Sequence, residues 1–122
     1  MKRLLFFITL IFFFNNLNLY SSENKGLTSI GNKEAKITVK VFSSLSCPHC
    51  AHFHAEVFNK LKKEFIDTNQ VKFEHHSFPL DLQALNAEKI LKCFEDNTKK
   101  FSFLNQVYSD QESWYRGKDI NS

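Results

Sequence analysis

The sequence predicts a mixed α/β fold built on one βαβ unit, and three observations support that prediction. Residues 36–43 alternate apolar and polar side chains, residues 48–66 repeat apolar side chains at helical spacing, and residues 71–77 alternate again. A strand, a long helix and a second strand form a crossover unit, in which the two strands are almost always parallel. We therefore expect a parallel strand pair joined by one helix.

The first strand is expected because its apolar side chains fall on one face and are β-branched: Ile37, Val39 and Val41. Residues 23–30 before it are polar and are expected to form a mobile lead-in, followed by a turn at residues 31–34. The stretch Ser43-Ser44-Leu45-Ser46 after it is expected to be the loop that delivers Cys47 to the helix.

The crossover helix is predicted from one apolar stripe at spacings of three and four, formed by Ala51, Ala55, Phe58, Leu61 and Phe65. Phe53 and Val57 widen this stripe, so we expect the helix to be covered on more than one side. Residues 67–70 are typical of a turn. In the second strand Val71, Phe73 and His75 alternate with Lys72, Glu74 and His76.

Two further helices are predicted after this unit. Asp81 is expected to cap a helix from Leu82 to about Asp96, and Thr98 is expected to cap a second one through Tyr108. Cys93 lies at the edge of the apolar stripe of the first of these helices, between Leu91 and Phe94. We therefore expect it to be a small buried hydrophobic residue.

The N-terminus has the pattern of a secretory signal peptide. Lys2 and Arg3 precede an apolar run from Leu4 to Phe14, and asparagines end that run. Eleven residues are too few for a bilayer, which needs about 20. We predict a signal peptide over residues 1–22; the alternative is a retained N-terminal anchor that extends to Tyr20. Cleavage would place the mature chain in an exported compartment.

Length and charge limit the functions to be considered. The 122 residues suffice for one domain at most. Without Lys2 and Arg3 the chain has 14 basic and 13 acidic residues, a net charge of +1, so no strong basic field favours nucleic acid as a partner. Its three cysteines, an odd number, include one close pair. In an exported protein this pattern favours catalytic over structural use of that pair.

The strongest functional signal is the stretch Cys47-Pro48-His49-Cys50, where the strand gives way to the helix. A helix N-terminus carries partial positive charge and unpaired N–H groups, which stabilise a nearby sulfur as the reactive thiolate. Pro48 fits the first helical position, where its missing N–H costs nothing. The His49 imidazole can favour the Cys47 thiolate by charge or by hydrogen bonding. Cys47 is thus the expected nucleophile and Cys50 the less exposed resolving thiol.

Two other uses of this cysteine pair are a structural disulfide and a zinc site. A structural disulfide across four residues would contribute little, because its entropic stabilisation grows with loop length. A zinc site would need more ligands than one C-x-x-C, and the candidates are His49, His52, His54, His75 and His76. His52 and His54 face different directions on a helix and are expected to be surface or packing residues. We assign no role to His75 and His76, and we expect neither a metal nor a cofactor.

With its surroundings, Cys47-Pro48-His49-Cys50 resembles the active site of the DsbA-like thiol:disulfide oxidoreductases of the bacterial periplasm. The supporting residues are Ile37-Thr38-Val39, Ser43-Ser44-Leu45-Ser46, Ala51-His52-Phe53-His54 and Phe78-Pro79-Leu80-Asp81. The resemblance implies a thioredoxin-like fold over residues 23–122, interrupted by a helical domain over residues 80–117. It also implies that Cys47 attacks, that Cys50 resolves, and that Pro48 and His49 tune the pair.

By the same resemblance, the substrates are exported proteins with cysteine thiols, the location is periplasmic, and a DsbB-like membrane protein is a possible reoxidant. Two departures stand out. Neither Pro48 nor Pro79 can be the family's cis-proline, so we expect the C-terminal part of the fold to be missing. Many members have a buried acid six residues before the first cysteine, where this chain has Val41. The alternatives left open are an isomerase or reductase on the same fold, an inactive remnant, and a metal-binding module.

Overall fold

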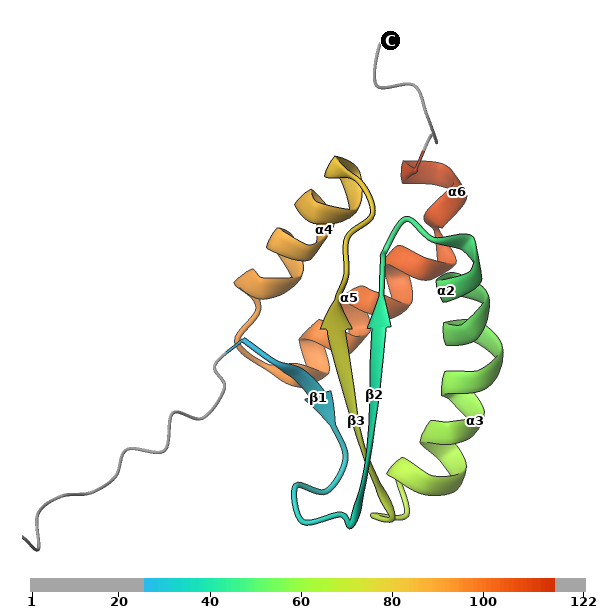
Figure 1. The fold of residues 1–122 in the computed structure, drawn as a ribbon, viewed down its shortest axis with the longest axis vertical. Coiled ribbons are helices and arrows are strands. Elements are labelled where there is room, and N and C mark those ends of the chain that lie inside the picture. The colour runs from blue at the N-terminus through green and yellow to red at the C-terminus, as the bar shows by residue number, and fades with distance from the viewer. Residues whose placement is uncertain (1–25, 116–122) are drawn as a thin grey trace, which may run out of the picture.

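The computed structural model describes residues 26–115, in which a three-stranded sheet packs on one face against helices (Figure 1). The predicted signal peptide, residues 1–22, lies outside the described residues. The mixed α/β class predicted from the sequence is confirmed. In the described part of the chain, no helix is both long enough and apolar enough to cross a membrane.

The sheet has the order β1-β3-β2. Strands β2 (Ile37–Ser43) and β3 (Val71–Ser77) run parallel and in continuous register, from Ile37 opposite Val71 to Ser43 opposite Ser77. The predicted parallel pair is therefore confirmed. Because β3 lies between two neighbours, its side chains are the more buried: Val71, Phe73, Glu74 and His75 are all buried.

Strand β1 (Thr28–Ile30) pairs antiparallel with β3 on the edge away from β2. The expectation of a mobile lead-in is therefore wrong for these three residues. The turn after β1 depends on Gly31, which has a φ of 102°. A Cβ at this position would lie 2.5 Å from the carbonyl oxygen of Val71, so only glycine fits here.

The crossover helix runs without a break from residue 48 to residue 66, as predicted. It consists of α2 (Pro48–His52), a π-helical stretch η1 (Phe53–Phe58), α3 (Asn59–Leu61) and a second π-helical stretch η2 (Lys62–Ile66). π-helical winding places more residues in each turn and so rotates the buried stripe. His54, Phe58 and Ile66 are buried, whereas Phe65 and Val57, expected in the stripe, are 41% and 48% exposed.

Three helices follow β3: α4 (Leu82–Cys93), α5 (Asn97–Ser109) and α6 (Gln111–Trp114). Asp81 caps α4 as predicted, accepting from the Ala84 N–H at 2.7 Å. The cap of α5 is Asp96 and not Thr98, because the Asp96 carboxylate accepts the Lys99 N–H at 2.9 Å. Helix α4 ends at Cys93, three residues before the expected position.

The core lies between the sheet and the helices on one of its faces. In Figure 1, α5 passes behind the sheet, and α2 and α3 run alongside β2. Phe58 lies at the centre, with its ring centroid 4.7 Å from that of Phe73 and 5.7 Å from that of Phe101. Contacts among aromatic rings from η1, β3 and α5 therefore join the crossover helix, the sheet and the C-terminal helices.

The opposite face of the sheet is turned toward the viewer in Figure 1 and has no described helix over it. Val39 and Val41 pack against the core, so the alternating residues of β2, including Lys40 and Phe42, face the open side. Phe42 is 67% exposed and stacks on His76, with ring centroids 4.8 Å apart.

We predict that Phe58→Ala lowers the free energy of unfolding by about 3–5 kcal/mol, because it removes a fully buried ring and leaves a cavity. The measurement is urea denaturation of the chain, followed by circular dichroism. Val57→Ala is the matched control on the same helix: its side chain is half exposed, and the loss should stay within about 0.5 kcal/mol. Equal losses in the two variants would contradict the placement of the core.

Candidate redox site at Cys47 and Cys50

The two cysteines lie where β2 gives way to the crossover helix, at the end of the sheet nearest α6 in Figure 1. Cys47 is the N-cap of α2 and has extended backbone geometry, with φ −82° and ψ 119°. Pro48 follows in the first turn, and Cys50 lies within α2. The three cysteines of the chain are free thiols, so the structure describes the reduced dithiol.

The loop before Cys47 is buried and held by its own serines. Ser44 Oγ lies 3.0 Å from Ser46 Oγ and accepts the Leu80 N–H at 3.3 Å. The Cys47 N–H donates to the Ser44 carbonyl at 3.2 Å, and Leu45 has no exposed surface. These contacts fix the direction in which the chain enters the helix and hence the position of the Cys47 sulfur.

Gln111 of α6 holds the same loop from the opposite side. Its side-chain amide donates to the Leu45 carbonyl at 2.7 Å and to the Cys47 carbonyl at 3.1 Å. Gln111 is buried, and 64 residues separate it from Cys47. This residue is not predicted from the sequence. No local signal marks it, because an isolated glutamine in a polar stretch gives no indication of what its amide contacts.

The pKa of the Cys47 thiol lies below its ordinary value. Partial burial raises this pKa, but the backbone N–H of Cys50, the Cys50 side chain and the backbone N–H of His49 outweigh it. Two of these three donors are backbone N–H groups in the first turn of the helix, as expected from the sequence. Cys47 therefore reaches the reactive thiolate form at a lower pH than a free cysteine does.

The pKa of the Cys50 thiol is raised above its ordinary value. Burial is the largest cause, the Ser44 N–H acts against it, and the hydrogen bond and charge of Cys47 raise the pKa further. The two sulfurs therefore differ in acidity: one thiol ionises readily while its neighbour keeps its proton. Such a difference suits an attacking and a resolving thiol.

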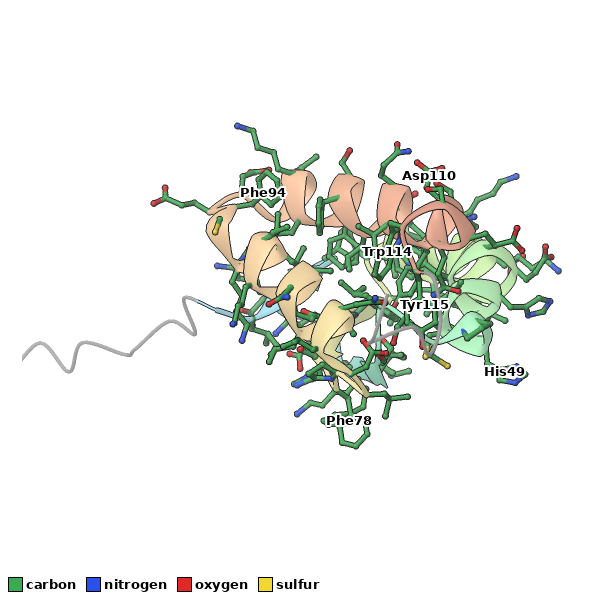
Figure 2. The ribbon with its side chains drawn as sticks, turned by 90° about the horizontal axis from the view of Figure 1, so that it is seen from above. His49, Phe78, Phe94, Asp110, Trp114 and Tyr115 are labelled. Carbon is green, nitrogen blue, oxygen red and sulfur yellow. The ribbon has the colours of Figure 1, made fainter. Side chains whose placement is uncertain are left out.

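Pro48 and His49 both lie exposed on the first turn of the helix. The contribution of His49 to the acidity of Cys47 comes from its backbone N–H. Figure 2 shows the His49 side chain projecting outward from the molecule. The role of its imidazole stays a prediction.

The remaining sulfur and the other histidines lie elsewhere. Cys93 is exposed, and its thiol donates to the Lys89 carbonyl at 3.3 Å, so the expectation that it is buried is wrong. His54 is buried, and its ring stacks on Phe58, so it is a packing residue, within the role expected for it. Burial lowers the pKa of His54. Within residues 26–115, no three His, Cys, Asp or Glu side chains lie close enough together to hold a metal ion.

The comparison with protein families places this chain. A family model described as thioredoxin matches residues 23–122, most of the sequence. The chain belongs to the thioredoxin family. Within that family its DsbA-like character, predicted from the Cys47-Pro48-His49-Cys50 motif, is confirmed by the relatives and structures described next.

Among curated proteins, this thioredoxin-family chain is 34% identical over 85 residues to a Rickettsia bellii protein provisionally named as a protein-disulfide oxidoreductase. The match covers 70% of this chain and 33% of that protein. It is 33% identical over 92 residues to disulfide bond formation protein D of Bacillus subtilis, covering 71% of this chain and 40% of that protein. The chain thus spans between a third and a half of these relatives.

Solved structures show the same similarity. Wolbachia pipientis alpha-DsbA1 matches with a TM-score of 0.70 and 34% identity, covering 72% of this chain and 44% of that one. Oxidised BdbD of Bacillus subtilis matches with a TM-score of 0.61 and 31% identity, covering 71% and 49%. The thioredoxin-like fold predicted from the sequence is therefore confirmed.

We predict that alkylation of Cys47 in the folded chain rises at a lower pH than in the chain unfolded by denaturant, because the helix N–H groups lower its pKa. The measurement is the alkylation rate against pH, with Cys50→Ser and Cys93→Ser leaving one thiol to read. Coincident curves would show that the helix start does not stabilise the thiolate. The reciprocal variant with Cys50 alone should titrate above the denatured control.

A separate prediction concerns Gln111. Gln111→Ala leaves the buried Leu45 carbonyl without this donor and should cost about 1–3 kcal/mol in the free energy of unfolding. The loosened loop should also shift the Cys47 alkylation curve toward that of the denatured chain. Gln83→Ala on the exposed side of α4 makes the same chemical change and should leave both measurements unaltered.

Proposed function

We propose that this chain carries out dithiol–disulfide exchange and introduces disulfides into exported proteins. The observation that carries the proposal is the contrast between the two thiols, since the pKa of Cys47 is lowered and that of Cys50 is raised. A low pKa at the attacking cysteine stabilises the reduced pair, which makes the corresponding disulfide a stronger oxidant. The names of the relatives, a protein-disulfide oxidoreductase and a disulfide bond formation protein, support the same class of reaction.

The exchange takes place in two steps. A substrate thiolate attacks the Cys47 sulfur of the Cys47–Cys50 disulfide, and the bond electrons leave with Cys50, which takes a proton from solvent. A second substrate thiolate attacks the substrate sulfur of this mixed disulfide, and Cys47 leaves as a thiolate. The substrate loses two electrons and forms a disulfide, while the cysteine pair gains them.

An exported location would favour oxidation of substrate thiols over reduction of substrate disulfides. We propose that residues 1–22 are a signal peptide and that the protein acts in the periplasm, where disulfides form and persist. Residues 80–117 are proposed as the inserted helical domain, with α4, α5 and α6 as its described helices. The substrates would be exported proteins with cysteine thiols, and a DsbB-like membrane protein would restore the disulfide.

The test counts the substrate disulfides that each oxidised chain produces. Chain carrying the Cys47–Cys50 disulfide is mixed with reduced, unfolded ribonuclease A, and free thiols and disulfides are counted by mass spectrometry. We expect about one substrate disulfide for each oxidised chain. Cys47→Ser should abolish the transfer. Cys50→Ser, first loaded as the mixed disulfide of Cys47 with a small thiol, should still yield a substrate disulfide, because the small thiol leaves in the first step and the second step does not use Cys50.

The control is Cys93→Ser, which removes an exposed thiol on α4 outside the helix-start site and should leave the transfer unchanged. Transfer that survives Cys47→Ser would overturn the proposal. An isomerase would instead restore activity to scrambled ribonuclease more readily than it oxidises the reduced protein. A metal-binding module would retain stoichiometric zinc after dialysis and lose it with Cys50→Ser.

A further inference from the structure

Helix α4 lies at one side of the molecule (Figure 1) and carries apolar side chains on its outer face. Its inner face packs into the molecule through three buried residues: Ala84, Glu88 and Leu91. The outer face carries four exposed residues, called here the outer stripe: Leu82, Leu85, Ile90 and Cys93. Leu82 is 65% exposed and Ile90 is 53% exposed. A helix on the surface of a globular protein ordinarily turns polar side chains to water, so this stripe indicates an interaction surface.

The outer stripe extends along the whole of α4. Successive residues of an α-helix are rotated by about 100°, so Cys93 lies only about 20° around the helix from Leu82. Leu85 lies about 60° to one side of Leu82, and Ile90 lies about 80° to the other. Positions 82 and 93 are eleven residues apart (93 − 82), which makes the stripe about 16 Å long. Two exposed polar residues, Asn86 and Lys89, lie in its middle.

The pattern of the stripe is the same when it is read from either end of the helix. An apolar residue is followed at the third position by a second apolar residue and then at once by a polar one. From the N-terminal end these residues are Leu82, Leu85 and Asn86, and from the C-terminal end they are Cys93, Ile90 and Lys89. A two-fold interface requires this symmetry, because residue i of one copy meets residue j of the other and j meets i.

The symmetry fits two α4 helices that pack antiparallel about a point between residues 87 and 88. Leu82 then lies opposite Cys93 of the second copy, and Leu85 lies opposite Ile90. Lys89 lies opposite Asn86, whose side-chain oxygen accepts hydrogen bonds from an ammonium group. Each positive helix N-terminus lies beside the negative C-terminus of the other helix. Parallel packing would instead place the two Lys89 ammonium groups opposite each other, which is unfavourable.

We propose that this chain forms a two-fold dimer in which the outer stripes of two α4 helices pack antiparallel. The partner that covers the stripe is thus a second copy of the chain. Phe78 and Leu80, which precede α4 and are 59% and 64% exposed, enlarge the apolar surface beyond one helix. The dimer also buries Cys93, whose thiol is exposed in the single chain, as a small apolar residue. The proposal does not rest on the proposed function, because no stripe residue belongs to the helix-start site.

Disulfide trapping tests the direction of the two helices. Leu82→Cys is combined with Cys47→Ser and Cys50→Ser, so that the introduced sulfur and Cys93 are the only thiols of the chain. Within one chain these two positions are about 16 Å apart along the helix, whereas a disulfide needs Cα atoms within about 7 Å. A disulfide between positions 82 and 93 must therefore join two copies.

The variant is oxidised with copper phenanthroline in air, and the linked peptides are identified by mass spectrometry. We expect a covalent dimer in which position 82 of one copy is joined to Cys93 of the other as the dominant linkage. Parallel packing would link 82 to 82 and 93 to 93, and chance collisions would give all three pairings. Either of these results, or no covalent dimer, would overturn the proposal.

Sedimentation equilibrium of the unsubstituted chain tests whether the contact closes at two copies. The mass should rise with concentration from one chain to two and no further, because a two-fold contact leaves no second site free. Ile90→Glu should raise the dissociation constant of the dimer by more than about tenfold, since each dimer would bury two unpaired carboxylates. Position 90 is half exposed in the single chain, so the urea unfolding midpoint of the dilute variant should not change.

The matched control is Val57→Glu, which replaces another half-exposed apolar residue on the crossover helix and should leave the mass unaltered. Equal weakening by Val57→Glu and Ile90→Glu would overturn the proposal, and so would a mass that stays at one chain or grows beyond two.

A measurement that leaves the stripe intact uses Cys47→Ser with Cys50→Ser, in which Cys93 is the single thiol. Its alkylation rate should fall as the chain is concentrated, to about a tenth when nine-tenths of the chain is dimeric. The fall should follow the dimer fraction measured by sedimentation, because the dimer covers the Cys93 sulfur. An alkylation rate that stays constant while the mass doubles would show that the contact lies elsewhere and would overturn the proposal.

Discussion

The interaction on which the site depends is that between the Cys47 sulfur and the N–H groups at the start of the crossover helix. That interaction works only if the sulfur is held at the helix start, because partial charges at a helix terminus act over about one turn. The rest of the structure supplies this placement. Strand β2 delivers the chain, the buried serine loop sets its direction, and Gln111 of α6 holds the Leu45 and Cys47 carbonyls.

Two kinds of contact join the sheet to the C-terminal helices. The aromatic cluster around Phe58 buries apolar surface, with Phe73 and Phe101 packed against Phe58 and against each other. The second kind is a series of buried hydrogen bonds that joins Tyr108 to Ser43, Ser43 to His75, and His75 to Glu88. It buries polar groups, but each of them has a partner. The first kind tolerates small shifts, whereas hydrogen bonds at 3.0–3.1 Å between four elements fix their relative positions.

Features that depend on neighbouring residues are predictable from the sequence, whereas features that depend on distant residues are not. The bounds of the crossover helix, the parallel strand pair and the Asp81 cap follow from side-chain periodicity and capping chemistry, which act within a few residues. Cys93 was misplaced because two residues along a helix correspond to a rotation of about 200°, so a neighbour of buried Leu91 faces the opposite side. Strand β1 was missed because three residues give no usable alternation, and only β3 makes them a strand.

The sequence by itself determined the chemistry of this protein: two thiols at a strand-to-helix junction, Pro48 in the first turn, and a family resemblance carried by contiguous residues. These features are local, so the order of residues is enough to reveal them. Only the tertiary structure decided which distant groups serve that junction. Gln111 reaches the loop from 64 residues away, and Glu88 meets His75 across two elements. Such pairings arise from the packing of the helices on the sheet, which no local pattern in the chain records.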